Sequence, residues 1–237
     1  MKLWQKETST NEKIDQFTVG NDRIYDLVLA PYDCKASKAH AKMLGKIGLL
    51  TKEEVESLSK TLDSIQKSAE QGDFVIETAF EDMHSKIEFL LTEKLGDLGK
   101  KIHTARSRND QVLVALQLYV KTELASVKKE LINLFNLLLE LAERHQNELL
   151  PGYTHMQVAM PSSFGLWFSA YAESLIDDVT FLNTASQLAN QNPLGSAAGF
   201  GSSFPRDREM PTQDVEVDTL KYHVVPSQLA RRQSEKA

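Results

Sequence analysis

The stretch NDQVLVALQLYVKTELASVKKELINLFNLLLELAERHQNEL, residues 109–149, decides the fold of this chain. It lies between Gly99 and Pro151 in a run that contains neither glycine nor proline, the residues that interrupt helices most strongly. Its apolar side chains recur in alternating steps of mostly three and four, at Leu113, Leu116, Val120, Leu124, Val127, Leu131, Leu134, Leu138 and Leu141. This heptad-like seam predicts one helix of about 60 Å, at 1.5 Å per residue. A compact domain of this size cannot bury such a helix, so we expect an elongated bundle that packs against other chains.

Shorter helices are predicted before the long one, over residues 21–50, 51–72 and 81–95. The first has a possible break at Pro31, and the second opens with Thr51 and Glu54, the spacing of a capping box. Glu81 and Asp82 open the third, where the helix dipole favours acidic side chains.

After the long helix, Pro151 and Gly152 form a break, and Pro161 suits the first turn of the next helix. A second apolar stripe follows at Phe164, Phe168, Tyr171, Leu175, Val179 and Leu182. No β-type alternation is evident, so the predicted fold class is all-α. We expect an amino-terminal helical domain over 1–107 and part of a central long-helix bundle over 108–237.

Two later segments interrupt the helical pattern. The Gly/Ser-rich loop 195–203 lacks the Lys-Ser or Lys-Thr pair of a phosphate-binding loop, so we expect it to allow close backbone approach or movement. Near the end, Pro211 and Pro226 fall where a helix would be expected, and an interior proline costs about 3 kcal/mol.

Composition excludes several classes of function. The 237 residues carry a net charge of -6, which gives no general attraction to nucleic acid or to an anionic membrane. No stretch reaches the roughly 18 consecutive apolar residues of a membrane-spanning helix, and the first residues lack the apolar run of a signal peptide. Cys34 is the only cysteine, so no intramolecular disulfide can form. These features predict a cytoplasmic protein.

The segment HTARSRNDQ, residues 103–111, lies at the start of the long helix and contains many polar and charged side chains. Asn109 or Asp110 could cap that helix, whose amino terminus favours anions. Arg106 and Arg108 could each bind a carboxylate through two parallel hydrogen bonds. The alternative is a charged capping loop without a ligand, and spacing alone does not separate the two.

The segment PGYTHMQ, residues 151–157, places Thr154, His155 and Gln157 at a break between two long helices. Histidine is the side chain most easily tuned for proton transfer near neutral pH, although a histidine in a turn can equally be structural.

In EDMHSKIE, residues 81–88, His84 and Glu88 lie one helical turn apart. No third ligand is apparent, so no metal site is predicted, and a structural role is favoured for His84.

These segments occur in an order that resembles argininosuccinate lyase, a member of the fumarase/aspartase superfamily. The resemblance rests on D-x-x-x-S-x-A-H (33–40), EDMHSKIE, IHTARSRNDQV, LLPGYTHMQ and NPLGSAAGFGSSFPRDRE (192–209). It implies β-elimination of argininosuccinate to arginine and fumarate, without a cofactor. A base removes a proton next to a carboxylate, the developing charge is stabilised, and the leaving nitrogen is protonated.

The resemblance also implies roles for individual residues. His155 resembles the family's active-site histidine, as proton acceptor or as the partner that positions another catalytic group. The substrate-binding set that the resemblance suggests is Ser107, Arg108, Asn109, Thr154, Gln157 and, by a looser match, Asp22. Family members are homotetramers in which three subunits contribute segments to each active site, and the seam over 109–149 fits that assembly.

One family motif is not found. The family's mobile loop Gly-Ser-Ser-x-Met-Pro-x-Lys-x-Asn supplies a catalytic serine, whereas Gly201-Ser202-Ser203 here precedes Phe204 and belongs to an earlier segment. We therefore expect a truncated chain of this family. The alternatives are a catalytically incompetent fragment or paralogue with a structural or assembly role, and a related lyase with another succinyl substrate.

Overall fold

The computed structural model describes residues 12–229, apart from the side chains of residues 12 and 15. Its contacts group the described residues into two compact units. The first contains the residues up to Tyr119 together with those from Asn190 onward, and the second contains Val120–Ala189. These units do not follow the predicted boundary at residue 107, which stays a prediction.

The first unit is built mainly of helices. In chain order they are α1 (Glu12–Val19), α2 (Asp22–Lys46), α3 (Lys52–Glu70), α4 (Met83–Leu95), α5 (Asp97–Lys100), a 3₁₀ turn (Lys101–His103), the first part of α6 (Arg108–Arg144), α8 (Glu209–Asp214) and α9 (Val224–Leu229). The two-residue strands β3 (Gln191–Asn192) and β4 (Thr219–Leu220) pair in parallel.

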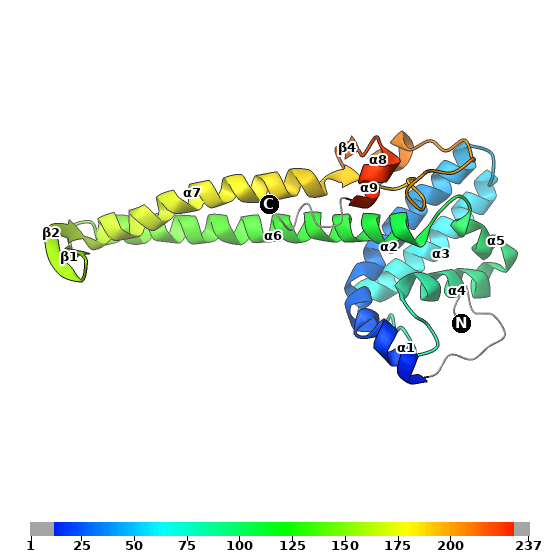
Figure 1. The fold of residues 1–237 in the computed structure, drawn as a ribbon, viewed down its shortest axis with the longest axis horizontal. Helices are drawn as coiled ribbons and strands as arrows, with labels where there is room; N and C mark the ends of the chain where they lie inside the picture. The colour runs from blue at the N-terminus through cyan, green and yellow to red at the C-terminus, as the bar shows by residue number, and fades with distance from the viewer. Residues whose placement is uncertain (1–11, 230–237) are drawn as a thin grey trace. The chain divides into compact units, whose positions relative to one another are not determined.

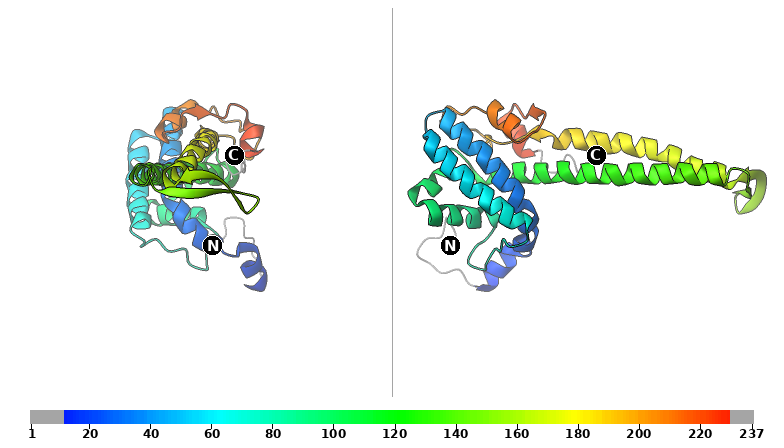
Figure 2. Two further views of the ribbon diagram at one scale, coloured as in Figure 1. Left: turned by 90° about the vertical axis from the view of Figure 1, so that its left-hand side faces the viewer. Right: turned by 180° about the vertical axis from the view of Figure 1, so that it is seen from behind.

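The core of the first unit lies among α2, α3 and α4, of which α2 and α3 run side by side in Figures 1 and 2. Its fully buried side chains include Leu44, Leu58, Leu62, Met83, Ile87 and Leu91. A second apolar cluster joins α2 to the start of α6 and to the later loops, through Ala36, Ala39, Val114, Leu118, Leu194, Val215 and Val217. The later loops, which contain Leu194, Val215 and Val217, thus pack against the start of α6.

Several predicted helix ends are confirmed. The Thr51 hydroxyl accepts from the Glu54 N–H at 3.2 Å, and a Glu54 carboxylate oxygen accepts from the Thr51 N–H at 2.8 Å. Asp82 caps α4 by accepting from the Ser85 N–H at 2.7 Å. The prediction of a possible helix break at Pro31 is wrong, because α2 continues through Pro31 with buried residues on both sides. Tertiary packing outweighs the cost of the proline there.

The prediction that Pro211 and Pro226 would destabilise a helix is also wrong. Each is the third residue of a six-residue helix, α8 or α9. A proline in the first turn loses no intrahelical hydrogen bond, because the N–H groups of that turn have no partner within the helix.

The second unit consists of two long helices and one two-stranded β-ribbon. It contains the rest of α6, the antiparallel strands β1 (Leu149–Thr154) and β2 (Gln157–Ser163), and α7 (Phe164–Ala189). The predicted end of the long helix at residue 149 and a helical start at Pro161 are therefore wrong. Pro151 and Pro161 instead lie opposite each other in the ribbon. A two-stranded ribbon tolerates prolines because every strand is an edge.

Within this unit, α6 and α7 lie side by side (Figures 1 and 2). Lys128 Nζ donates to Asn183 Oδ1 at 2.9 Å, and the rings of His145 and Phe168 lie 6.3 Å apart. The inward face of α7 repeats at steps of three and four, at Gly165, Phe168, Ala172, Leu175, Val179, Leu182 and Ala185. Small residues at the buried positions allow close helix packing.

The other faces of these helices are apolar and exposed, whereas most positions of the predicted seam and stripe are half-buried. The exposed side chains are Val127, Ile132, Leu134, Leu137 and Leu139 on α6, and Leu166, Trp167, Tyr171, Ile176 and Phe181 on α7. Exposed apolar surface on this scale is typical of a protein–protein interface. None of the helices over residues 12–229 is long and apolar enough to cross a membrane.

The start of α7 gives a test of this packing. A Cβ at Gly165 would lie 2.6 Å from Gln146 Cα and 2.8 Å from the Ala142 carbonyl oxygen, and neither backbone atom can rotate away. We expect Gly165→Ala to lower the free energy of unfolding by about 1–3 kcal/mol, as overpacking does. Urea unfolding followed by circular dichroism measures this loss. Ser174→Ala, on the exposed face of the same helix, is the control, and equal stability of the two variants would contradict the close approach.

Candidate functional site

Arg108, the first residue of α6, is held by side chains of the α4 segment. Its Nε lies 3.3 Å from Asp82 Oδ2, and its Nη1 lies 3.8 Å from Glu88 Oε1. Its Nη2 donates to Ser85 Oγ at 3.3 Å, and its Nη1 donates to Gln111 Oε1 at 3.2 Å. About a third of the side chain remains exposed. The guanidinium is therefore pre-oriented, with part of its surface open to an anionic ligand.

The amino terminus of α6 is capped by Ser107, not by Asn109 or Asp110 as predicted. The Ser107 hydroxyl accepts from the Asn109 N–H at 3.3 Å. In return, Asp110 Oδ1 accepts from the Ser107 N–H at 3.1 Å, so the two side chains satisfy two N–H groups at this helix end. The predicted residues Ser107, Arg108 and Asn109 thus lie together at a helix amino terminus, a position that favours anions.

A buried charged cluster lies behind this motif. Asp33 is fully buried in α2, with His84 Nδ1 at 3.0 Å and Arg106 Nη2 at 3.7 Å from its Oδ1. Burial alone would raise the pKa of Asp33, but the charges of His84, Arg106 and Arg108 lower it overall. Both Asp33 oxygens and both His84 ring nitrogens lack an aligned hydrogen bond among the described residues. Electrostatic attraction therefore holds this cluster, while Arg106 Nη1 also donates to Ser37 Oγ at 2.7 Å.

The sequence signal for this cluster is the spacing of Asp33, Ser37 and His40, which puts three polar side chains on one face of α2. All three are buried in the structure. In the sequence this motif indicated only the family resemblance, and the pairing of its carboxylate with His84 and Arg106 emerges from the structure.

His40 is held in the neutral form. Its Nε2 lies 2.9 Å from the Thr104 carbonyl oxygen, to which it donates in the neutral tautomer. Burial, together with the charge of Arg106, lowers the pKa of His40 to about 3. The contact also anchors the turn at Ala105, whose φ of 58° is in the left-handed region.

This environment makes stability depend on pH. The unfolded chain binds a proton at His40 below about pH 6.5, whereas the folded chain does not until about pH 3. The contribution of neutral His40 is therefore fully present above pH 6.5 and is lost as the pH falls toward 3. Between pH 7 and pH 5 we expect wild type to lose about 2 kcal/mol relative to His40→Gln, which donates but does not titrate. Urea unfolding at both pH values measures this, and a constant difference would contradict the neutral, buried state.

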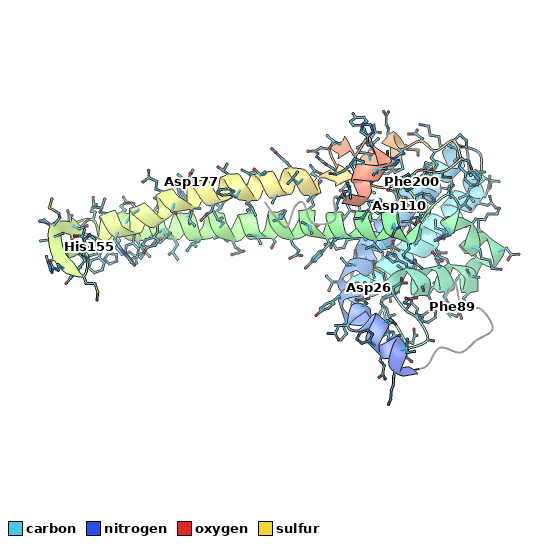
Figure 3. The ribbon with its side chains drawn as sticks, in the orientation of Figure 1. Asp26, Phe89, Asp110, His155, Asp177 and Phe200 are labelled. Atoms are coloured by element: carbon cyan, nitrogen blue, oxygen red, sulfur yellow. The ribbon has the colours of Figure 1, made fainter. Side chains whose placement is uncertain are left out.

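Thr154, His155 and Gln157 lie at the tip of the β1–β2 ribbon, in the second unit (His155 is labelled in Figure 3). Thr154 pairs with Gln157, and both loop residues have positive φ, 48° at His155 and 62° at Met156. A two-residue turn with both φ positive normally carries asparagine or glycine, so His-Met is strained there. The turn presents His155 to solvent on a strained, exposed backbone, which is a feature of functional sites.

Asp22 is the exposed first residue of α2. One turn later, Asp26 accepts from the Met83 N–H at 2.9 Å, and burial raises the pKa of its carboxyl group. Asp26 therefore joins α2 to the start of α4, a role that no local sequence signal indicated. The joint site that would bring Asp22 and the ribbon residues to Arg108 stays a prediction.

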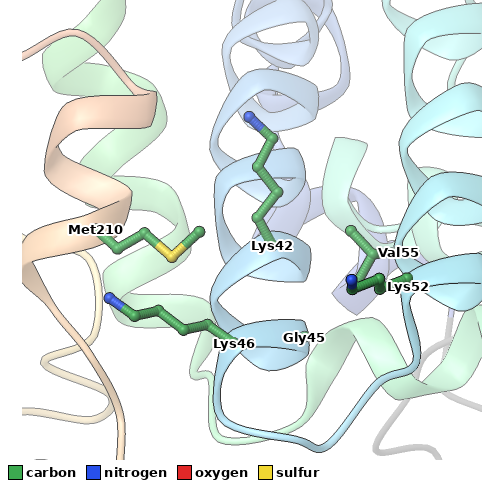
Figure 4. A pocket seen from close by; sticks show the side chains of 6 residues that line it. All are labelled: Lys42, Gly45, Lys46, Lys52, Val55 and Met210. Atoms are coloured by element: carbon green, nitrogen blue, oxygen red, sulfur yellow. The ribbon is translucent and has the colours of Figure 1, made fainter.

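Other features of the described residues do not add to this site. A pocket of about 340 Å³ is lined by Lys42, Gly45, Lys46, Lys52, Val55 and Met210 (Figure 4) and contains none of the predicted residues. Lys42 and Lys46 are paired there with Asp214 and Asp207. Over residues 12–229, no three histidine, cysteine or acidic side chains are grouped to hold a metal ion.

Comparison with known proteins adds a sequence match. Residues 5–232 match a protein-family model described as Lyase. The chain is 55% identical over 235 residues to an argininosuccinate lyase of Phocaeicola vulgatus, covering 99% of this chain and 53% of that protein. It is 40% identical over 230 residues to one from Thermotoga neapolitana, covering 97% and 58%. The chain thus spans about half the length of these relatives.

Solved structures share the fold. An EDDS lyase in complex with formate superposes with a TM-score of 0.76 at 23% identity, over 93% of this chain and 44% of that one. A class II fumarase from Schistosoma mansoni gives 0.67 at 18% identity, over 85% and 47%. These likenesses bear on the fold alone, and they are consistent with the all-helical class.

Proposed function

The chain belongs to the lyase family, and from this premise we propose that it forms the amino-terminal part of an argininosuccinate lyase. The proposed reaction is the β-elimination of argininosuccinate to arginine and fumarate in arginine biosynthesis. The observation that carries the proposal is Arg108, held by Asp82, Ser85 and Glu88 at the start of α6 with part of its guanidinium exposed. The relatives named as argininosuccinate lyases support the choice of substrate.

The chemistry divides between two places on the chain. Arg108 is suited to bind a carboxylate of the succinyl moiety, and the N–H groups at the start of α6 favour the same charge. The predicted proton-transfer residue, His155, lies at an exposed and strained turn, with Thr154 and Gln157 beside it as substrate contacts. Asn109 and Ser107 complete the proposed set of substrate-binding residues. Asp22 belongs to this set only by the looser match to the family.

We propose further that copies of this chain associate, as homotetramers in the resembling family do, and that each site combines Arg108 and His155 from different copies. The exposed apolar faces of α6 and α7 support association, because a chain that kept them in water would leave large hydrophobic surface uncovered. A cytoplasmic location and the absence of a nucleic-acid or membrane partner belong to the same proposal.

The test combines binding and turnover with the purified 237-residue chain. We expect argininosuccinate to bind in isothermal titration calorimetry and His155→Asn to weaken that binding. Fumarate release, followed by ultraviolet absorbance, reads turnover in the same samples. Release that His155→Asn abolishes would extend the proposal to full activity, and the absence of binding would contradict it.

The exposed apolar faces of α6 and α7 support a second candidate function, that of a structural chain with a role in assembly. That function predicts a stable oligomer without affinity for argininosuccinate. Sedimentation and calorimetry on one preparation separate the two candidates.

A further inference from the structure

Asp110 lies at the centre of an unusual set of contacts. Its side chain is fully buried at the start of α6 (Figure 3). Oδ1 accepts from the Ser107 N–H at 3.1 Å, and Oδ2 accepts from the N–H groups of Gly195 at 3.1 Å and Ala197 at 2.8 Å. One carboxylate thus binds two segments that are more than eighty residues apart in sequence.

The second segment, residues 195–199, is a loop in which one non-glycine residue, Ala197, has a strained backbone. Its φ angles are 86° at Gly195, 52° at Ala197 and 112° at Gly199. An alanine in the left-handed region persists only where its surroundings enforce it. Asp110 accepts from two N–H groups of the loop, and Gln228 Nε2 donates to Ser196 Oγ at 2.8 Å and to the Ala197 carbonyl oxygen at 3.1 Å.

The contacts require a carboxylate. All three backbone partners are N–H donors, so the side chain must present only acceptors. Burial raises the pKa of Asp110 overall, although Arg106 and the three N–H groups act in the opposite direction. An asparagine would have the same shape but would direct an NH₂ group at one set of donors, which leaves buried donors without acceptors.

We propose that Asp110 is a positioning residue that fixes Ser107, Arg108 and Asn109 and the loop 195–197 in one arrangement for the bound substrate. The inference rests on the proposed function for its ligand, because Ser107–Asn109 are the proposed carboxylate-binding residues. The coupling of the two segments through one buried carboxylate stands on the structure itself. Asp110 touches no substrate in this proposal and acts through the backbone that it holds.

The experiment compares wild type, Asp110→Asn and Asp110→Glu in the full chain. Hydrogen exchange with mass spectrometry reads protection in residues 104–109 and 194–199, and calorimetry reads affinity for argininosuccinate. Asp97→Asn is the matched control, because Asp97 is exposed and paired only with Lys100 among the described residues. For Asp110→Asn we expect exchange about tenfold faster in both segments together, with affinity about tenfold weaker. Asp110→Glu retains the charge and should recover part of both effects, which a loss of folding would not allow.

Three outcomes would overturn the inference. The first is unchanged exchange in Asp110→Asn, and the second is faster exchange in one segment alone. The third is a parallel loss of protection in both segments with wild-type affinity. If Asp110→Asn does not fold, Asp110→Glu is scored by the same criteria against wild type. If wild type binds no argininosuccinate, the proposed function fails, and exchange alone then decides whether Asp110 couples the segments.

Discussion

Replacing Asp33 with alanine should cost this chain about 3 kcal/mol or more in its free energy of unfolding, because the change leaves buried charge without its counter-charge. Asp33 is fully buried, and its carboxylate faces His84 at 3.0 Å and Arg106 at 3.7 Å. Without Asp33, the guanidinium of Arg106 would lie buried without this counter-charge. Asp33→Asn, which keeps the shape and removes the charge, should be nearly as destabilising.

Urea unfolding followed by circular dichroism measures the Asp33 effect, and Asp97→Asn serves as an exposed control that should leave the unfolding free energy unchanged. The double variant Asp33→Ala, Arg106→Met removes both charges and should recover part of the loss, since the two residues are directly coupled. A loss for Asp33→Ala no larger than that of an ordinary surface substitution would show that the cluster is not held by charge.

The second large effect is expected at Arg108. Arg108→Ala should weaken argininosuccinate binding about a hundredfold, since it removes a charge-assisted contact that can be bidentate. Arg108→Lys keeps the charge but loses the planar geometry that Asp82 and Ser85 hold, and we expect a loss of about tenfold. Calorimetry on the three proteins gives this ranking. Arg144→Ala, which removes an exposed arginine paired with Glu140, should bind as wild type does. Equal affinity of Arg108→Lys and wild type would mean that only net charge matters.

The helices were largely predictable from local signals. The run without glycine or proline predicted α6. The spacing of Thr51 and Glu54 predicted the start of α3, where the two residues form reciprocal hydrogen bonds. Both signals act within a few residues along one helix, so no tertiary information is needed to interpret them.

The β1–β2 ribbon was missed for a physical reason. Sequence reveals a strand when apolar and polar side chains alternate between core and solvent. Most side chains of this ribbon are exposed and none is buried, so its residues do not alternate between a core and solvent, and Pro151, Gly152 and Pro161 suggested loops. The strained turn at His155 and Met156 follows from the pairing of the strands and cannot be deduced from the residue types, which disfavour it.

The site was predictable in part. Sequence motifs predicted the segment 107–109 and the residues at the ribbon tip. They did not predict which side chains and loops contact Arg108 and Asp110. Asp82 and Glu88 come from α4, and Gly195 and Ala197 come from a loop late in the chain. Such contacts arise from tertiary packing, and a single sequence does not show which distant segments it brings together. Asp110 could be read as a cap from its position, but not as the residue that fixes the loop 195–197.

The measurement that tests the central claim most directly uses two defective chains. Arg108→Ala and His155→Asn proteins are unfolded, mixed in equal amounts and refolded together, and argininosuccinate binding sites are counted by calorimetry. If each site takes Arg108 from one copy and His155 from another, random assembly should restore about one quarter of the wild-type sites, although neither parent alone binds well. A mixture that binds no better than its parents, under conditions in which refolded wild type binds, would contradict a site shared between copies of this chain.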